Sequence, residues 1–258
     1  MTGLLLSSAL AVLAYMTLLF IIALARRDNS LADLGWGLGF ILVAALSFVR
    51  EPGPTPRRVL VLALVALWGL RLAGHIFLRG RKRGEDFRYA KWRKDWGRWF
   101  VPRSYLQVFL LQGALLLVIS TPVLIVQHST RAGLTLLDAA GAAVWITGFV
   151  FESVGDAQLR RFKRDPANRG RIMTTGLWAY SRHPNYFGEA TMWWGIFLIG
   201  LSVPGGWAGA AGPAVLTFLL LRVSGIPPLE KRYAGDPEFA AYACVTSRFL
   251  PRPPRRLT

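Results

Sequence analysis

The sequence contains a single cysteine, Cys244, in 258 residues. One thiol cannot form an intrachain disulfide, and it cannot supply the several cysteine ligands of a structural zinc site. Histidine is also scarce, because only His75, His128 and His183 occur, and their spacing matches no zinc or di-iron site. We therefore expect no metal site in this protein.

Charged residues are few as well. They make up 17% of the chain, against 53% hydrophobic residues, and the mean hydropathy is +0.37. This composition is too apolar for an ordinary soluble domain and indicates a protein of the lipid bilayer. The net charge of +17 raises the question of nucleic acid, but the basic residues fall between long apolar runs. We therefore interpret the charge as membrane topology and expect no nucleic-acid partner.

Long apolar runs dominate the chain, and each is close to the roughly 20 residues that a helix needs to cross the hydrocarbon core. The first run follows no basic segment and precedes no small-residue cleavage site, so we expect a retained span rather than a signal peptide. The pattern predicts an all-α polytopic membrane bundle of about seven transmembrane helices, forming a single membrane domain over 1–258. The runs cover about 3–25, 32–49, 59–78, 104–126, 134–155, 186–203 and 207–226.

Lysine and arginine alternate strongly between the two sides of these spans. Twenty-five lie in one set of loops and in the C-terminal segment, whereas the opposite loops hold only Arg50, Arg57, Arg58 and Arg131. By the positive-inside rule, this split predicts an N-terminus outside and a C-terminus in the cytoplasm.

A basic and aromatic segment follows the third run. The loop at 79–89 leads into Trp92, Trp96 and Trp99 at helical spacing, with lysine and arginine between them. This pattern is typical of an amphipathic helix in the headgroup region, because tryptophan favours the interface and basic residues attract anionic lipid. The alternative is a wall or lid for a binding site.

Four charged residues follow helical steps at the end of the fifth run: Glu152, Asp156, Arg160 and Lys163. Steps of four, four and three residues place them on one helix face. Two acids followed by two cations would suit a long ligand with hydroxyl and amide groups inside and phosphates at the rim. The same spacing also fits ordinary surface salt bridges, which contribute only tenths of a kcal/mol.

A second polar segment, Gly-Leu-Trp-Ala-Tyr-Ser-Arg-His-Pro-Asn-Tyr-Phe-Gly-Glu at 176–189, immediately precedes the sixth run. Ser181 is a candidate N-cap, and Pro184 suits a first helical turn. Arg182 and His183 add positive charge to a helix N-terminus. A helix N-terminus with added positive charge is suited to binding a phosphate group.

Several ionisable residues lie where burial in lipid is costly. Glu189 lies about one turn into a membrane helix, so it needs either a partner, for which Arg222 is a candidate, or a function. Asp33 begins the second run, and Arg71 and His75 share a face of the third. By the predicted topology, these three lie in the cytoplasmic half.

Three segments together resemble the steroid 5α-reductase-like membrane proteins of bacteria. They are the acid-then-base face at 149–164, the segment at 176–189, and Ser-Gly-Ile-Pro-Pro-Leu-Glu-Lys at 224–231. The similarity begins near Asp33, includes Glu-Asp-x-Arg-Tyr at 85–89, and covers most of the chain. It implies an integral protein of the bacterial inner membrane that reduces, with NADPH, a C=C bond conjugated to a carbonyl in a lipophilic substrate.

In those reductases the matching regions bind NADPH on the cytoplasmic side, which here corresponds to about 134–258. The resemblance implies that Asp156, Asn185 and Glu189 face the nicotinamide and ribose parts. The cofactor-binding residues that we expect are Glu152, Asp156, Arg160, Lys163, Arg171, Arg182, His183, Asn185, Tyr186, Glu189, Arg222 and Glu230.

The sequence departs from the steroid reductases at the group that polarises the substrate carbonyl. Those enzymes use a Gln-Glu pair on an early helix and a nearby tyrosine, whereas the second run here reads Ala-Asp-Leu-Gly-Trp-Gly at 32–37. Asp33, Arg71, His75 and Tyr89 are the candidates for this role. With Glu189, we take Asp33, His75 and Tyr89 as candidate catalytic residues.

The Arg-His-Pro-x-Tyr-x-Gly core also resembles membrane methyltransferases of the isoprenylcysteine carboxyl type, which bind S-adenosylmethionine. Those enzymes usually have an adjacent glutamate pair after the last span, whereas here Lys231 follows Glu230. A dinucleotide also explains the basic residues better, because S-adenosylmethionine carries no phosphate. A third alternative is a non-catalytic lipid-binding protein that binds neither cofactor.

Overall fold

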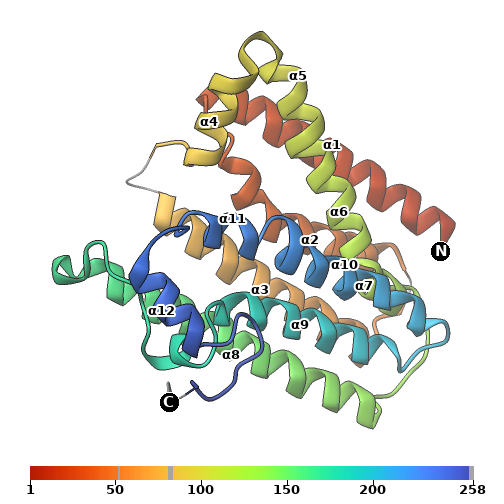
Figure 1. The fold of residues 1–258 in the computed structure, drawn as a ribbon. Helices are drawn as coiled ribbons and strands as arrows, with labels where there is room; N and C mark the ends of the chain where they lie inside the picture. The colour runs from red at the N-terminus through yellow and green to blue at the C-terminus, as the bar shows by residue number, and fades with distance from the viewer. Residues whose placement is uncertain (52, 81–83, 256–258) are drawn as a thin grey trace. The chain divides into compact units, whose positions relative to one another are not determined.

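The computed structural model describes residues 1–51, 53–80 and 84–255. Residues 81–83 of the basic loop therefore lie outside the described part of the chain. Figure 1 shows the helices coloured by their position in the chain. Contacts divide the chain into two compact units. Unit 1 contains Met1–Asp138 and Ile199–Gly212, and unit 2 contains Ala139–Leu198 and Pro213–Thr258.

The protein is an all-α polytopic membrane protein, as the sequence predicts. Among the described residues, six helical segments are long and apolar enough to cross a bilayer. The predicted run at 186–203 is also helical, as α9 (Pro184–Gly200), but its 17 residues are shorter than those of the six. The six segments are Thr2–Arg26, Leu31–Arg50, Pro56–Gly80, Phe87–Ile119, Leu136–Arg164 and Gly206–Lys231.

Unit 1 begins with three long helices, α1 (Thr2–Arg26), α2 (Leu31–Arg50) and α3 (Pro56–Gly80). Helices α2 and α3 approach closely at Gly37 and Gly69. A Cβ atom on Gly37 would lie 2.7 Å from the Gly69 carbonyl oxygen, so only glycine allows this approach. Asp33 lies about one turn before this contact, at the start of α2.

The fourth span is built from several consecutive helical pieces. Gly97, with φ 49°, separates α4 from the rest by a backbone conformation that favours glycine. The predicted amphipathic segment is thus α4 and η1, and the apolar run at 104–126 corresponds to the pieces after them. The pieces are α4 (Phe87–Trp96), η1 (Gly97–Trp99), α5 (Phe100–Ser104), η2 (Tyr105–Leu110), α6 (Leu111–Ile119) and α7 (Thr121–His128).

Two arginines counted among the sparse opposite-side charges are buried in unit 1. Arg57 and Arg58 are each 1% exposed. Arg57 forms an ion pair with Asp138, with Nε 2.7 Å from Oδ1, and Arg58 donates to the carbonyls of Phe48 and Glu51. Arg57 therefore has an acid partner and Arg58 has backbone carbonyl partners, as buried charges require.

Unit 2 is organised by α8 (Leu136–Arg164) packed against α9. A Cβ atom on Gly148 would lie 2.5 Å from the Gly188 carbonyl oxygen, and one on Gly188 would lie 2.5 Å from that of Gly148. This close approach brings the acids of α8 beside the first turns of α9. The remaining elements of the chain are η3 (Pro166–Asn168), η4 (Gly176–Ala179), η5 (Gly206–Ala210), α10 (Ala211–Phe218), η6 (Leu219–Val223), α11 (Ile226–Lys231) and α12 (Pro237–Val245).

Candidate functional site

Unit 1 contains an acid and tyrosine cluster, which we call the Tyr89 cluster: Asp33, Asp86, Arg88 and Tyr89. The Tyr89 hydroxyl donates to Asp33 Oδ1 at 2.8 Å. Arg88 donates to Asp33 Oδ2 at 2.5 Å and to Asp86 Oδ1 at 2.9 Å. Tyr89 is 2% exposed, so the phenol lies in a shielded environment.

Two backbone contacts hold this cluster together. The amide of Asn29, just before α2, donates to Glu85 Oε1 at 3.0 Å. The amide of Asp86 donates to the Ser30 hydroxyl at 2.8 Å. These bonds tie the loop before α2 to the segment before α4, so Asp33 and Tyr89 meet although they are far apart in sequence.

Local helix signals position the two partners. Asp86 is the N-cap of α4 and accepts from the Arg88 amide at 3.0 Å. Asp33 lies in the first turn of α2, where the helix dipole favours a negative charge. Burial acts to raise the pKa of Asp86, but the hydrogen bonds from Arg88 outweigh it and lower the pKa. Arg88 therefore favours the ionised form of Asp86, and it also binds Asp33.

Sequence reasoning identified Asp33 and Tyr89 but missed Arg88 as their partner. The signal was present, because Arg88 lies within the Glu-Asp-x-Arg-Tyr motif. The other candidates for the polarising role, Arg71 and His75, are half-buried in α3. Glu189 is half-buried in α9, which is part of unit 2.

Unit 2 contains a second cluster, which we call the Glu230 cluster: Arg182, His183, Glu230 and Arg248. Glu230 Oε1 lies 3.2 Å from His183 Nε2 and 3.4 Å from Arg182 Nε. Glu230 Oε2 lies 3.0 Å from Arg248 Nε. The structure thus brings together three residues that the sequence predicted for the cofactor site, and it adds Arg248, for which the sequence carried no signal.

The C-terminal segment is hydrogen-bonded to the turn before α9. The Arg182 amide donates to the Ser247 carbonyl at 2.8 Å, and the Arg252 amide donates to the Tyr180 carbonyl at 3.0 Å. The Ser181 hydroxyl donates to the Phe249 carbonyl at 2.8 Å and accepts from the His183 amide at 3.1 Å. Ser181 is therefore not the N-cap that we predicted for α9, because its side chain fixes the turn two residues earlier.

The pKa of His183 is lowered in this cluster. Burial lowers its pKa, the neighbouring Arg182 and Arg248 lower it further, and Glu230 acts in the raising direction without reversing the shift. Because a carboxylate only accepts, Nε2 must carry the hydrogen that faces Glu230. The imidazole also stacks on the Tyr186 ring, with centroids 5.8 Å apart.

Asp156 on α8 and Asn185 on α9 form a polar pair in unit 2. The Asn185 amide nitrogen donates to Asp156 Oδ1 at 3.2 Å, and Asp156 is 8% exposed. The amide oxygen of Asn185 is buried and has no hydrogen-bond partner within the described residues. A buried acceptor without a partner is costly, so this oxygen is suited to a ligand that donates a hydrogen bond.

The remaining predicted cofactor residues differ in exposure. Glu152 is buried on α8. Exposed cations among them are Arg160, Lys163, Arg171 and Arg222.

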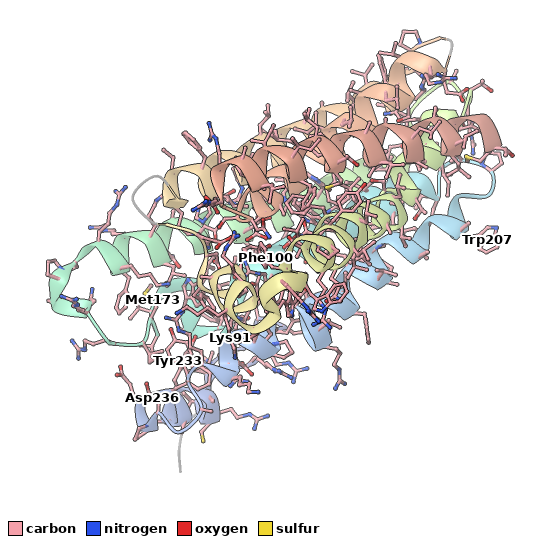
Figure 2. All side chains as sticks on the ribbon, turned by 90° about the horizontal axis from the view of Figure 1, so that it is seen from above. Lys91, Phe100, Met173, Trp207, Tyr233 and Asp236 are labelled. Atoms are coloured by element: carbon pink, nitrogen blue, oxygen red, sulfur yellow. The ribbon has the colours of Figure 1, made fainter. Side chains whose placement is uncertain are left out.

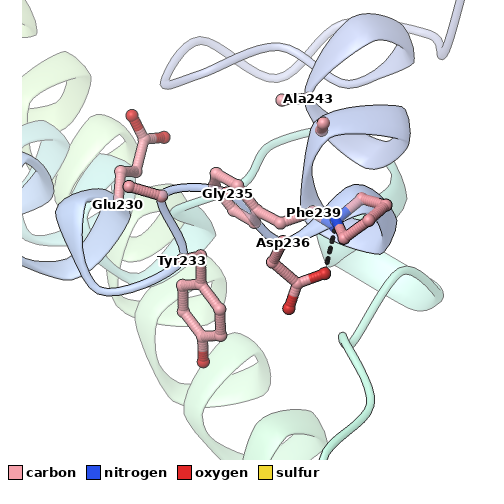
Figure 3. Close-up of a pocket in the computed structure, with 9 residues that line it drawn as sticks. Glu230, Tyr233, Gly235, Asp236, Phe239 and Ala243 are labelled. Carbon is pink, nitrogen blue, oxygen red and sulfur yellow. Dashed lines mark hydrogen bonds between the residues drawn. The ribbon is translucent and has the colours of Figure 1, made fainter.

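A hollow of about 340 Å³ adjoins the Glu230 cluster (Figure 3). Its lining includes Glu230, Tyr233 and Phe239. The rings of Tyr233 and Phe239 are stacked, with centroids 5.1 Å apart, and the Arg182 guanidinium carbon lies 5.8 Å from the Phe239 centroid. Flat aromatic rings beside a cationic group form a surface suited to a planar, negatively charged ligand.

Comparison with known proteins gives a family and distant relatives. The chain shares 27% identity over 195 residues with the uncharacterized protein C594.04c of Schizosaccharomyces pombe, covering 66% of this chain and 53% of that protein. It shares 35% identity over 81 residues with 3-oxo-5-alpha-steroid 4-dehydrogenase 1 of Bos taurus, covering 31% of this chain and 30% of that protein. The chain therefore spans about half of the first relative and under a third of the second. No solved structure matches.

The matching family extends across both clusters. Residues 19–246 match the sequence model described as "Protein of unknown function (DUF1295)". This range contains the Tyr89 cluster and all of the Glu230 cluster except Arg248. The chain belongs to the DUF1295 family.

Proposed function

We propose that this protein is a membrane oxidoreductase that uses NADPH to reduce a C=C bond conjugated to a carbonyl in a lipophilic substrate. The observation that carries the proposal is the shielded Tyr89 hydroxyl, held 2.8 Å from Asp33 in a protein similar to a steroid dehydrogenase. Adding hydride to the β-carbon of an enone drives negative charge onto the carbonyl oxygen. A pre-oriented donor in a site with little water stabilises that charge.

In this proposal, the Tyr89 cluster recognises the carbonyl oxygen of the substrate. Tyr89 donates its hydroxyl proton to that oxygen in place of Asp33. Arg88 binds Asp33 and fixes its side chain, and Asp33 holds the phenol in place until the substrate carbonyl accepts the hydroxyl hydrogen. Tyr89 is the catalytic residue, and Asp33 and Arg88 are positioning residues.

The residues of unit 2 fit a dinucleotide. The buried Asn185 oxygen can accept from an amide or hydroxyl group, and Asp156 beside it offers further acceptors. The exposed cations Arg160, Lys163 and Arg171 suit phosphates, and the stacked rings of Tyr233 and Phe239 suit a nucleobase. When bound, NADPH supplies the hydride.

Methyl transfer from S-adenosylmethionine is the second candidate. One observation favours it: the structure brings Glu230 into contact with Arg182 and His183, which belong to the segment shared with the methyltransferases. Three basic side chains already contact Glu230, so its carboxylate is less available to pair with the positively charged sulfur of S-adenosylmethionine. We therefore favour hydride transfer.

The test is reduction of a lipophilic enone by purified protein in detergent. With NADPH and a 3-oxo-4-ene steroid or an isoprenoid enone, we expect oxidation of NADPH matched by a product two mass units heavier than the enone. Tyr89→Phe should greatly reduce the rate. If no enone in a lipophilic panel is reduced, or if Tyr89→Phe is as active as wild type, the proposal is wrong.

A further inference from the structure

The first helical piece of the fourth span has two opposite faces. Tyr89, Trp92 and Trp96 share one face of α4, and their rings form a continuous series with centroids 5.5 and 5.2 Å apart. Lys91 and Lys94 fall on the opposite face of α4, because a step of three residues returns to the same side, and Arg98 follows in η1 after the turn at Gly97. These three residues and Arg103 in α5 form what we call the α4 basic surface.

The α4 basic surface is exposed, and its charges are available. Lys91, Lys94, Arg98 and Arg103 are all exposed, and Lys91, Lys94 and Arg103 form no ion pair within the described residues. The other two cations of α4, Arg88 and Arg93, already form ion pairs. Arg88 binds Asp33 and Asp86, and Arg93 binds Glu85 at 2.7 Å while lying over the Phe100 ring.

Large apolar side chains border this surface. Trp99 is 55% exposed, Val101 is 43% exposed and Phe87 is 57% exposed. Figure 2 shows Lys91 of α4 well apart from the exposed Trp207 of η5. Tryptophan at both ends of a spanning unit is the distribution expected of interfacial anchors.

The length of the fourth span sets the depth of this surface. The helical segment Phe87–Ile119 has 33 residues, whereas about 20 cross the hydrocarbon core. Because the apolar run begins near residue 104, we infer that α4 and η1 precede the part that crosses the core and lie at the level of the headgroups. Free cations beside exposed tryptophan at that level match an anionic headgroup above and acyl chains below.

We propose that the α4 basic surface binds the phosphate headgroups of anionic phospholipids. A free phosphate could satisfy the cations, but it would gain nothing from Trp99 and Val101. The exposed apolar side chains therefore assign the site to a lipid. The lipid fixes α4, and with it the neighbouring Tyr89 cluster, against the membrane surface.

The test uses full-length protein in detergent, titrated with dioleoylphosphatidylglycerol or dioleoylphosphatidylcholine and measured by native mass spectrometry. We expect retention of phosphatidylglycerol over phosphatidylcholine, undiminished by excess inorganic phosphate. The variant K91Q/K94Q/R98Q should bind phosphatidylglycerol more weakly by about fivefold per charge removed. The matched control R161Q/R164Q/R169Q removes three exposed charges from the end of α8 and the following loop and should bind as wild type.

Thermal unfolding of each variant checks that folding is retained, and Lys94→Glu offers a single change if the triple variant fails to fold. Equal retention of the two lipids by wild type would overturn the proposal. So would displacement by inorganic phosphate, or equal losses in the α4 variant and its control.

Discussion

The phenolic oxygen of Tyr89 lies 2.8 Å from Asp33 Oδ1, although 56 residues separate them in the chain. The contact exists because the loop before α2 is hydrogen-bonded to the segment before α4. It joins a buried donor to an acid that is already bound by Arg88. This geometry is the basis of the catalytic role that we propose for Tyr89.

We predict that Tyr89→Phe lowers kcat for enone reduction about 100-fold, because it removes a donor to the developing enolate oxygen. The free energy of unfolding should fall by only about 1 kcal/mol, since one hydrogen bond is lost. Tyr105→Phe is a matched control in the same unit, because the Tyr105 hydroxyl lies 2.9 Å from Thr17 Oγ1. It should cost similar stability and leave kcat unchanged. Equal kcat losses in both variants would remove the special role of Tyr89.

The lowered pKa of His183 predicts a pH dependence of stability. The folded state holds the neutral imidazole, so it binds protons less readily than the unfolded chain, whose histidine has the ordinary pKa of 6.5. The stabilisation is present above that value and is lost as the pH falls through the lowered pKa. Unfolding in detergent, measured from neutral to mildly acidic pH, should show this loss, and His183→Asn should reduce the slope. If acidification instead raises the free energy of unfolding, then Glu230 raises the pKa of His183 by more than burial lowers it.

The approach of α8 and α9 predicts a sharp steric effect. Gly188→Ala places a Cβ atom 2.5 Å from the Gly148 carbonyl oxygen, and backbone cannot move aside cheaply. We expect a loss of about 1–3 kcal/mol in the free energy of unfolding. Gly74→Ala on α3 is the control, because a Cβ atom there has no neighbour within 4 Å. If Gly188→Ala unfolds at the wild-type temperature, the two helices do not pack as described.

Orientation gives an independent prediction. The 25 to 4 division of lysine and arginine predicts that a reporter fused to the C-terminus lies in the cytoplasm and that one inserted near Gly133 lies outside. The burial of Arg57 and Arg58 leaves even fewer accessible charges on the second side. A C-terminal reporter found outside would place Arg160 and Arg171 away from the cytosolic dinucleotide pool and contradict the proposed function.

The helical fold could be predicted from the sequence because hydrophobic run length is a local property that the bilayer imposes directly. The segment before α9 was less predictable. Serine is a residue type that often caps helices, yet the Ser181 hydroxyl donates to the Phe249 carbonyl. No local pattern predicts a contact with a residue 68 positions away. Arg248 was missed for the same reason, since its contact with Glu230 depends on the path of the C-terminal segment.

Single site residues could likewise be predicted from the sequence, whereas their contacts with one another could not. Asp33 was a candidate because charge is costly near a membrane, and Tyr89 because the steroid reductases use a nearby tyrosine. The pairing of the two could not be predicted, because it depends on the tertiary contacts of Asn29 and Ser30. The helical face of Asp156 was readable from spacing. The partner of Asp156, Asn185, lies on another helix and is brought near by the Gly148 and Gly188 approach.

The most direct test of the proposed hydride transfer is thermal unfolding of the purified protein with NADPH and, separately, with S-adenosylmethionine. A ligand that binds only the folded state raises stability by about 2.7 kcal/mol at a hundred times its Kd, which a melting curve resolves. We predict that NADPH raises Tm, that added salt and replacement by NADH weaken the effect, and that Asp156→Asn removes most of it. S-adenosylmethionine should leave Tm unchanged. A rise in Tm with S-adenosylmethionine and none with NADPH would contradict hydride transfer and assign the protein to methyl transfer.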